Sequence, residues 1–483
     1  MTTAHPTPEP ATPAHDDGRL AAVREAAAYV ASWIAYQGEL RGTPGIQAAI
    51  RYRGELVLDL SWGVADVTTG QPLTNEHLFR IASHSKTFTA TAIMQLAAAG
   101  ALRLDDCVGR WLAELVGTEV EEVTIRELLG HQGGVIRDGV DADYWQRGAP
   151  FPDHDTLREI SRNDGKVFAR NEHFKYSNIG FGLLGLVIEA ASGMSYDEYV
   201  ISRIVAPLKL TRTGPEWDPA RTDEYAAGHT GLIAQSDLRR TITHVDTRAL
   251  APATGWYSTA VELSAYLDAH RLGDDRLLDD DAKRLLHRRE SEIVSGGVLH
   301  RYGLGFELRE VDGTDLVGHS GGYPGHITRT WLDPANELVV SVLTNAIDGP
   351  ADLLATGAVS LLRLALSVSD SSSAAAESAP TGRFASLWSV LDIAKLGGEV
   401  FALYPAQVDP AATAEPLRAM EGELRTEEKA GFGATGERVH VERSADGGVR
   451  TVVMGGMTLW PIDTYRYALK TREPSKLLER MSL

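Results

Sequence analysis

The stretch Phe79-Arg-Ile-Ala-Ser-His-Ser-Lys-Thr-Phe-Thr-Ala90 places Ser83 three residues before Lys86. Residues three apart on a helix share a face, so a helix here holds the Lys86 amine beside the Ser83 hydroxyl. A serine hydroxyl is a weak nucleophile until a neighbouring base removes its proton. A lysine is such a base only when neutral, and burial and the positive end of a helix dipole both lower its pKa. Taken alone, the same pair also fits a capping serine and an exposed lysine.

Two further short motifs follow far along the chain. Tyr176-Ser-Asn178 offers a hydroxyl that can relay protons or, as a phenolate, act as a base, and an amide that can bond a lysine and a substrate carbonyl. His319-Ser-Gly321 lies in a glycine-rich run, where the backbone can approach a ligand and aim an N–H at an oxyanion. Separately, these motifs also fit a core tyrosine and a glycine-rich hairpin. Together, in this order, they predict one site.

Periodicity predicts an α/β body with strands at both ends and helices in the middle. A tight-turn signal at Arg53-Gly54 joins two strands within Gly45–Trp62, and Thr124 opens a helix with a capping-box pattern. The other expected helices are Arg19–Gln37, Thr87–Ala99, Phe181–Ser192 and Leu353–Leu366. The other expected strands are Tyr302–Leu308, Asp315–His319 and Glu337–Asn345.

The composition changes towards the C-terminus. Ser367–Pro380 is rich in serine and alanine and is typical of a linker. Beyond it come short apolar runs broken by glycine, proline and aspartate, namely Val400–Tyr404, Arg438–Arg443 and Arg450–Met454. Alternation of apolar and polar residues in the second run is that of a half-exposed strand. We therefore expect a small antiparallel β domain of roughly 100 residues, a usual domain size.

Three segments resemble the family of penicillin-binding proteins, class C β-lactamases and related esterases and D-aminopeptidases. They are Phe79–Ala90, Thr124–Gly134 and Gly255–Leu263, within a resemblance that extends over roughly Ala21–Ser367. It implies a β-lactamase-like α/β fold, an antiparallel sheet flanked by helices with an inserted all-helical subdomain. The C-terminal part is similar to the lipocalin-like β-barrel of several relatives. The expected order is a disordered tail (1–18), the hydrolase domain (19–367), a linker (368–382) and the lipocalin-like domain (383–483).

The resemblance also implies roles for individual residues. Ser83 would be acylated, with Lys86 and Tyr176 handling protons and Asn178 contacting both Lys86 and substrate. The backbone N–H groups of Ser83 and Gly322 would form the oxyanion hole. His319 and Gly321 of the third motif would line the substrate site. Neither a metal nor an organic cofactor would be needed.

One departure from the pattern bears on the substrate. β-Lactamases of this family carry Lys-Thr-Gly as the third motif, whereas this chain has His319-Ser-Gly321. A titratable imidazole replaces the permanent charge that would hold a β-lactam carboxylate. The His-x-Gly form is similar to D-aminopeptidases, to esterases of this fold and to penicillin-binding-protein-type thioesterases that release and cyclise nonribosomal peptides.

These observations favour a serine hydrolase or acyltransferase acting on D-amino-acid-containing peptides or amides. The alternatives are a macrocyclising thioesterase served by a peptidyl carrier protein, a carboxylic-ester hydrolase, and a receptor that is acylated with little turnover. Intact Ser83, Lys86, Tyr176 and Asn178 argue against an inactive relative.

Composition narrows the partners and the location. A formal net charge of -19 over 483 residues argues against nucleic acid or an anionic membrane surface as partner. The N-terminus lacks the basic and apolar regions of a signal peptide, and no run reaches the roughly 18 apolar residues of a membrane span, so we expect a cytoplasmic protein without a membrane partner. The single cysteine, Cys107, forms no intrachain disulfide and is interpreted as packing.

Four other polar residues near the motifs stay outside the predicted catalytic set. His84 follows the nucleophile on its helix, where neighbours point elsewhere, and His131 in Gly130-His-Gln-Gly is typical of a turn. Arg329 and His326 lie in a strand-like segment, where an arginine is usually solvated.

Overall fold

The computed structural model describes residues 13–232, 238–311, 313–369, 379–420, 423–429 and 433–471. Contacts divide the chain into two compact units, which are described separately. The larger unit is Arg41–Ala355, and the other combines the residues up to Leu40 with those from Thr356 onward. The expected helices Arg19–Gln37 and Leu353–Leu366, at the two ends of the hydrolase domain, thus group largely with the C-terminal part. The predicted domain boundaries at residues 18, 367 and 382 stay a prediction.

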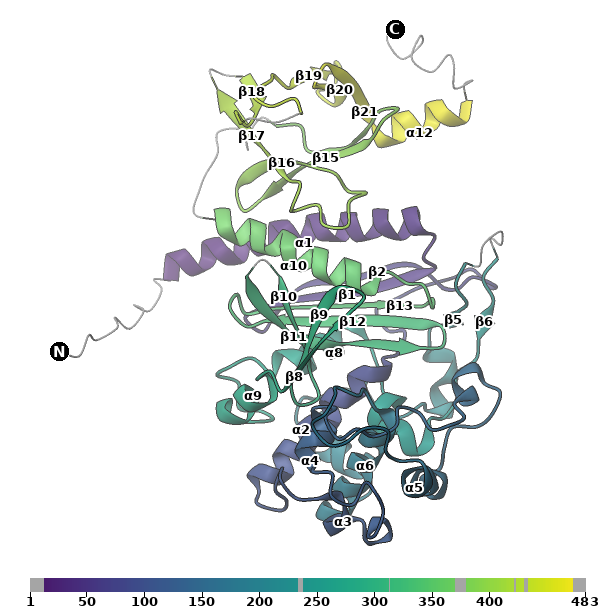
Figure 1. Cartoon of the computed structure of the whole chain (residues 1–483). Helices are drawn as coiled ribbons and strands as arrows, with labels where there is room; N and C mark the ends of the chain where they lie inside the picture. Colours follow the sequence, from purple (N-terminus) through teal and green to yellow (C-terminus); the bar gives the residue numbers. More distant parts are fainter. Residues whose placement is uncertain are drawn as a thin grey trace, which may run out of the picture. The chain divides into compact units, whose positions relative to one another are not determined.

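A nine-stranded antiparallel sheet forms the framework of the larger unit (Figure 1). Its strands in spatial order are β3 (Gln71–Pro72), β2 (Glu55–Asp66), β1 (Gly45–Tyr52), β13 (Leu338–Thr344), β12 (His326–Asp333), β11 (Thr314–Tyr323), β10 (Glu307–Val311), β9 (Val298–Tyr302) and β8 (Ser291–Ser295). The predicted hairpin is confirmed, since Arg53 and Gly54 between β1 and β2 have φ angles of 51° and 84°. Two positive φ values are those of the turn type that matches strand twist.

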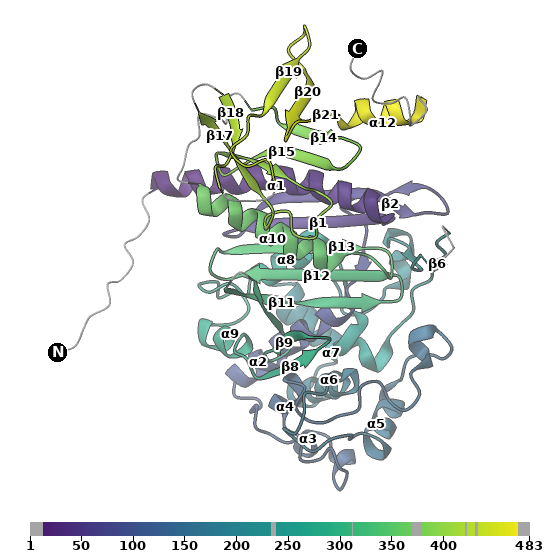
Figure 2. The same cartoon turned by 45° about the horizontal axis from the view of Figure 1, so that its top comes forward.

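Helices inserted between β2 and β8 gather on one side of this sheet (Figures 1 and 2). They are α2 (Ser85–Ala98), α3 (Val108–Trp111), α4 (Ile125–Leu129), α5 (His154–Asn163), α6 (Asn178–Ser192), α7 (Tyr196–Val200), α8 (Ala260–Asp268) and α9 (Asp280–Leu286). The capping box predicted at Thr124 is present, with reciprocal bonds to Glu127 of 3.2 and 2.9 Å. These helices confirm the inserted helical subdomain.

Short elements connect the longer ones. They are the turns η1 (Ala82–His84), η2 (Ala113–Leu115), η3 (Asp143–Gln146), η4 (Ile201–Val205), η5 (Pro219–Glu224), η6 (Arg248–Leu250) and η7 (Ala251–Gly255), and the strand pairs β4 (Phe79–Arg80) with β7 (Tyr257–Ser258) and β5 (Gly228–His229) with β6 (Thr241–Ile242). Aromatic stacking holds α2 in place, because the Phe88 ring lies 3.8 Å from that of Trp256 and 3.6 Å from that of Tyr266. The N-terminus of α2 is thereby fixed in the interior.

The expected single strand over Tyr302–Leu308 is wrong. Tyr302 ends β9 and Glu307 begins β10, and the Gly303 N–H donates to the Phe306 carbonyl (2.9 Å) in the turn between them. Gly305 in this turn has φ +81°, and a β-carbon there would lie 2.5 Å from the Ala90 Cβ. The glycines therefore serve a turn that passes directly over α2, rather than a strand.

The C-terminal part of the second unit is an eight-stranded antiparallel sheet that nearly closes into a barrel, which confirms the predicted β domain. Its strands in spatial order are β18 (Glu423–Thr426), β17 (Glu415–Met420), β16 (Glu399–Leu403), β15 (Val390–Leu396), β14 (Gly382–Ala385), β21 (Met457–Pro461), β20 (Val449–Met454) and β19 (His440–Arg443). The Val439 N–H donates to the Leu424 carbonyl (2.7 Å), which brings the chain just before β19 beside β18. Helix α12 (Ile462–Thr471) follows β21.

Helices α1 (Pro13–Arg41) and α10 (Ala351–Val368) belong with this barrel by contact, α10 from Thr356 onward. The Trp33 indole N–H of α1 donates to the Pro405 carbonyl (3.1 Å), and the Tyr29 hydroxyl donates to Asp392 (3.0 Å). Gly357 of α10 lies against Trp33, since a β-carbon there would come within 2.5 Å of the indole. The first helix begins six residues before the expected Arg19, and a proline is well tolerated in a first helical turn. Residues 1–12 of the predicted tail lie outside the described residues, as do 370–378 of the linker.

Within the described part of the chain, α10 is the one helix whose length and mean hydropathy, 1.5, would allow it to cross a membrane, and the bent pair Asn178–Ser192 and Tyr196–Val205 passes the same test when taken together. Of the α10 segment, 61% is buried inside the protein.

Candidate active site

The chain turns sharply just before Ser83. Ala82 has φ +46°, a conformation that costs about 1–2 kcal/mol for a residue with a β-carbon. Ser85 holds this turn, because its hydroxyl donates to the Ala82 carbonyl (2.5 Å) and accepts the Trp256 N–H (3.2 Å). This turn, η1, connects strand β4 to the start of α2, so Ser83 lies just before the helix that holds Lys86, and its side chain is only partly buried.

Lys86 is fully buried and meets three oxygen atoms. Its Nζ lies 3.2 Å from Ser83 Oγ, 2.7 Å from Asn178 Oδ1 and 2.9 Å from the Ala253 carbonyl oxygen. Burial lowers the pKa of Lys86 well below its ordinary value, although the charge of Asp138 opposes this. A neutral amine has two N–H donors and one lone pair. With the donors directed to Asn178 and Ala253, the lone pair faces the Ser83 hydroxyl.

Tyr176 lies on the other side of the nucleophile. Its hydroxyl donates to Ser83 Oγ over 2.8 Å. Burial raises the pKa of Tyr176 above its ordinary value, so the phenol stays protonated. Of the two roles that the sequence left open, proton donation fits this environment and a standing phenolate does not. Lys86 is therefore the group that is ready to accept a proton from Ser83.

Asn178 links Lys86 to a carboxylate that the sequence did not single out. Its Oδ1 accepts from Lys86, and its Nδ2 donates to Asp138 Oδ1 (2.6 Å). The Trp145 indole N–H also donates to Asp138 (3.0 Å), and Arg137 pairs with the same carboxylate (3.1 Å). These bonds orient the Asn178 amide with its oxygen towards the lysine. Asp138 stands in a loop without a motif, so no local pattern could have revealed it.

His319 lies on β11 and is buried. A glycine-rich hairpin at the surface would have left this side chain exposed. Its Nδ1 lies 2.7 Å from the Ser320 carbonyl oxygen, which can only accept, so Nδ1 carries the proton and Nε2 accepts from the Tyr302 hydroxyl (2.9 Å). Burial lowers the pKa of His319 to about 4, against the opposing charge of Glu307. The position that is a lysine in β-lactamases thus holds a neutral side chain at physiological pH.

Glu307 and Tyr302 were missed because they stand at the ends of the two strands that the sequence merged. Ser320 donates its hydroxyl to Glu307 (2.6 Å), and Arg329 forms an ion pair with the same carboxylate. Although burial opposes ionisation, the charge of Arg329 and the hydrogen bond from Ser320 hold the pKa of Glu307 well below its ordinary value. Glu307 is therefore a carboxylate that is held next to Ser320 of the third motif.

The two glycines of the third motif have different surroundings. A β-carbon on Gly321 would lie 2.2 Å from the Ile81 carbonyl oxygen, so this glycine is needed for β11 to pack on the segment before Ser83. Gly322 is exposed, and a β-carbon there would meet only Ile327 at 3.7 Å. Its position after the motif is compatible with the oxyanion hole, which stays a prediction.

The four residues kept outside the catalytic set have structural partners. His131 packs on the Tyr176 ring with centroids 4.3 Å apart and accepts the Ser177 N–H (3.2 Å). His84 contacts the Ile81 carbonyl and Thr330, and His326 accepts the Arg80 N–H (2.9 Å). Arg329 was expected in solvent, but it is only 6% exposed because it pairs with Glu307 and Asp352.

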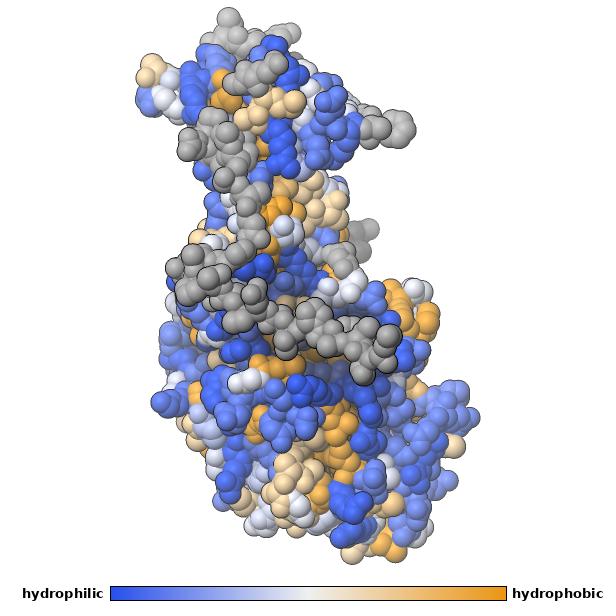
Figure 3. Space-filling view, turned by 90° about the vertical axis from the view of Figure 1, so that its left-hand side faces the viewer, coloured by the Kyte–Doolittle hydropathy of each residue, from blue (hydrophilic) through white to orange (hydrophobic). Residues whose placement is uncertain are grey.

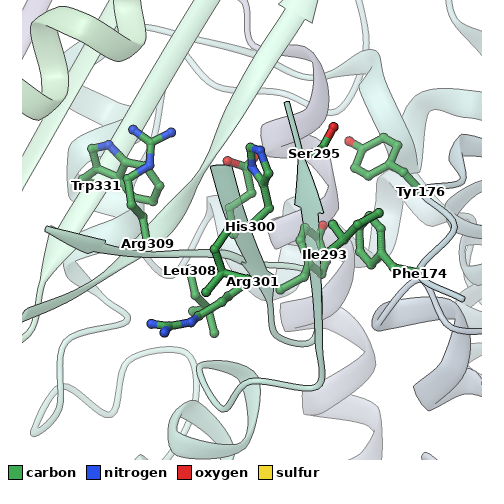
Figure 4. Close-up of a pocket in the computed structure, with 12 residues that line it drawn as sticks. Phe174, Tyr176, Ile293, Ser295, His300, Arg301, Leu308, Arg309 and Trp331 are labelled. Carbon is green, nitrogen blue, oxygen red and sulfur yellow. The ribbon is translucent and has the colours of Figure 1, made fainter. Parts of the chain in front are cut away.

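A cavity of about 290 Å³ opens beside Tyr176 (Figure 4). Aromatic and aliphatic side chains form most of its wall, and Glu307 and Arg309 also line it.

Comparison with known proteins identifies the family of this chain. The model of the family described as Beta-lactamase matches residues 30–363, more than two thirds of the chain. The chain belongs to the beta-lactamase family. This confirms the resemblance and explains why a serine–lysine pair, a Tyr-x-Asn motif and a His-x-Gly motif meet in one place.

Relatives within the family carry several names. Penicillin-binding protein 4* of Bacillus subtilis (strain 168) is 31% identical over 291 residues, which cover 57% of this chain and 62% of that protein. A D-aminopeptidase of Brucella anthropi is 27% identical over 344 residues, 68% of this chain and 61% of the relative. The chain therefore spans somewhat less than two thirds of these two relatives.

Among solved structures, a D-amino acid amidase from Ochrobactrum anthropi SV3, complexed with L-phenylalanine amide, superposes with a TM-score of 0.59 at 25% identity. The match covers 71% of this chain and the whole of the amidase.

Proposed function

We propose that this protein is a serine hydrolase or acyltransferase that forms an acyl-enzyme at Ser83 with D-amino-acid-containing peptides or amides. One observation carries the proposal. Lys86 Nζ and Tyr176 Oη both lie within hydrogen-bond distance of Ser83 Oγ, at 3.2 and 2.8 Å, and burial favours the neutral form of each. The nucleophile therefore has a proton acceptor on one side and a proton donor on the other.

Acylation follows from this arrangement. Ser83 Oγ attacks the substrate carbonyl carbon while its proton passes to the Lys86 amine. The tetrahedral intermediate then breaks its C–N bond, and the Tyr176 hydroxyl gives its proton to the departing nitrogen. The Lys86 ammonium returns a proton to the Tyr176 oxygen, which restores both groups. The products are a Ser83 ester and a free amine.

Deacylation uses the same groups in reverse. Water or an amine enters on the side that the leaving group vacated. As it attacks the ester carbon it gives a proton to the Tyr176 oxygen, whose own proton passes to the Lys86 amine. The C–O bond to Ser83 then breaks, and the Lys86 ammonium gives a proton to Ser83 Oγ. Water gives a carboxylic acid and an amine gives a new amide, so one site supports both hydrolysis and acyl transfer.

Two observations support D-amino-acid amides as substrates. Relatives in the comparisons are named D-aminopeptidase and D-amino acid amidase. Neutral His319 provides no cation for the carboxylate of a β-lactam. A cytoplasmic location and, for the thioesterase alternative, a peptidyl carrier protein as partner belong to the same proposal.

The test is intact-mass spectrometry of the full chain with matched D- and L-aminoacyl amides, short esters and peptidyl thioesters. We expect a covalent adduct with a D-aminoacyl amide, mapped by digestion to the peptide that holds Ser83, and its loss in Ser83→Ala with unchanged thermal unfolding. Full turnover by folded Ser83→Ala would refute the acyl-enzyme. Faster acylation by esters or thioesters than by any D-amide would replace the proposed substrate class with that alternative.

A further inference from the structure

The hairpin formed by β8 and β9, Ser291–Tyr302, stands at the edge of the nine-stranded sheet. Its two strands pair with each other over five residue pairs, whereas β9 pairs with β10 only through Tyr302 and Arg301. Gly296 and Gly297 form its turn with φ angles of 58° and 80°. Only the base of the hairpin is therefore built into the sheet, and the rest projects from it.

This projecting part carries aliphatic side chains that the core does not cover. Ile293, Val294, Val298 and Leu299 are 38%, 68%, 54% and 45% exposed. On the face drawn in Figure 3, apolar side chains reach a mostly hydrophilic surface only in patches. Neighbouring exposed apolar side chains indicate a binding surface, whereas single scattered ones are ordinary.

Ile293 and Leu299 of the hairpin both line the 290 Å³ cavity, and Phe174, Tyr176, Tyr302 and Trp331 contribute aromatic surface. Figure 4 shows Tyr176 and Phe174 beside Ser295 and Ile293 of the hairpin, with Trp331 and Arg309 at the other end. The volume lies near the lower end of the range for small-molecule sites, enough for a large side chain with part of its backbone.

The charged residues that line the cavity are already paired. Glu307 binds Arg329 and Ser320, and Arg309 makes two 3.0 Å bonds to Asp352. Arg301 pairs with Glu310 at 3.0 Å. A charged ligand group would have to compete with these partners. The cavity therefore selects chiefly by apolar contact.

Tyr176 connects this cavity to the reaction. Its hydroxyl lies 2.8 Å from Ser83 Oγ, and its side chain also forms part of the cavity wall. In the proposed mechanism this hydroxyl protonates the departing nitrogen, so that nitrogen must come within hydrogen-bond distance of it. The group attached to the nitrogen then extends along Tyr176, towards the hairpin.

We infer that the cavity between Tyr176 and the β8–β9 hairpin binds a large apolar side chain on the leaving-group side of the scissile bond. The inference rests on the proposed function and names the part of the substrate that this function leaves open. An amine acceptor enters by the path of the leaving group, so the same cavity favours amines that bear an apolar side chain as acceptors. Ile293 and Leu299 are specificity-determining residues that do not touch the reacting atoms.

The experiment keeps the acyl group constant and varies the leaving group. The full chain receives one D-aminoacyl group as its unsubstituted amide, its glycine amide conjugate and its phenylalanine amide conjugate, and kcat/KM is measured for each. We expect the phenylalanine conjugate to exceed the unsubstituted amide by about 10-fold or more, because burying such a side chain contributes roughly 1.5–3 kcal/mol.

Ile293→Ser and Leu299→Ser should each reduce this preference by about 3–10-fold and leave kcat/KM for the unsubstituted amide within about twofold. Val294→Ser is the matched control, because Val294 is as apolar and more exposed on the same hairpin but does not line the cavity. It should leave the preference unchanged.

Each other outcome overturns the inference. Wild-type enzyme without a preference for the apolar leaving group would do so, and this measurement needs no variant to fold. The inference would also fail if Ile293→Ser and Leu299→Ser lowered kcat/KM equally on all three substrates, or if Val294→Ser had the same effect as these variants. It would fail as well if the variants changed the molar mass measured by light scattering without changing the preference, since the hairpin would then be a contact between copies of the protein. Failure of the proposed function looks different, since no substrate would then form an adduct at Ser83.

Discussion

The nucleophile segment Ile81–Thr87 and the β8–β9 hairpin have opposite construction. In the segment, Ser85 and Lys86 are fully buried, and their polar atoms bond to main-chain and side-chain partners within the segment and from two other parts of the chain. In the hairpin, Val294 and Val298 are more than half exposed, and pairing with the rest of the sheet is limited to the base of the hairpin. One region is fixed by many bonds, and the other by few.

The difference shows how one fold can keep its chemistry while it changes substrates. Proton transfer requires donor and acceptor at fixed distances, which only a packed interior maintains. Selection of a side chain requires apolar surface near the reaction, and an edge hairpin can vary without disturbing the buried groups. We therefore expect substitutions in the segment to act on all substrates and those in the hairpin to act on some.

The largest effect is expected at Lys86. Lys86→Met removes the proton acceptor and should lower the acylation rate constant by about 10³-fold or more on every substrate, as measured by stopped-flow or quenched mass spectrometry. Because the folded-state pKa of Lys86 is depressed, the enzyme should be active above that pKa and lose activity as the pH falls through it. We call this fall in rate towards low pH the limb of the pH–rate profile. A limb at the ordinary pKa of lysine would contradict the assignment of a neutral Lys86 amine.

A second variant assigns this limb. Burial lowers the pKa of His319 to about 4, and a fall in rate that belonged to the imidazole would vanish when a side chain that does not titrate replaces it. Because we assign the fall in rate to Lys86, His319→Gln should leave its position on the pH axis unchanged, whatever it does to the rate. A limb that moves with His319 would transfer the role of the titrating group from Lys86 to the imidazole.

Tyr176→Phe should have the next largest effect, because it removes the proton for the leaving group and keeps the ring. We expect about a 10²-fold loss of kcat/KM on amides, whose nitrogen leaves only when protonated. The loss should be smaller on a p-nitrophenyl ester of the same acyl group, whose leaving group needs no proton. An equal loss on both would indicate that Tyr176 positions Ser83 and does not donate to the leaving group.

The smallest expected effects concern stability, which should differ between the two regions. Ser85→Ala leaves the buried Trp256 N–H and Ala82 carbonyl without their partner and should lower the free energy of unfolding by about 1–3 kcal/mol. Val294→Ser should change it by no more than about 0.5 kcal/mol. Denaturant unfolding followed by tryptophan fluorescence measures both. Equal destabilisation would mean that the hairpin is as firmly integrated as the segment.

The sequence predicted the parts of the site that a short pattern can hold. Helical spacing placed Lys86 beside Ser83, and the Tyr176-Ser-Asn178 motif reached the same place because it opens the buried helix α6. Asp138 has no such pattern, because it acts through Asn178 from a loop 40 residues away in sequence. Its role depends on a tertiary contact that no local signal contains.

Strand boundaries were harder to predict for a similar reason. The run from Tyr302 to Leu308 has the apolar content of a strand, but Gly303 and Gly305 form a turn that packs over α2. That packing depends on Ala90, more than 200 residues earlier in sequence. Tyr302 and Glu307 were overlooked together with the turn between them.

The position of β8 at the end of the sheet also affects how the protein behaves in concentrated solution. An edge strand offers unsatisfied backbone groups to another chain, and apolar side chains beside it add to the attraction. The formal net charge of -19 opposes such encounters by repulsion between molecules. Salt shortens the reach of that repulsion to about 10 Å at 0.1 M. Purification at high ionic strength therefore weakens the protection of this edge, and colloidal stability is best preserved at low salt and neutral pH.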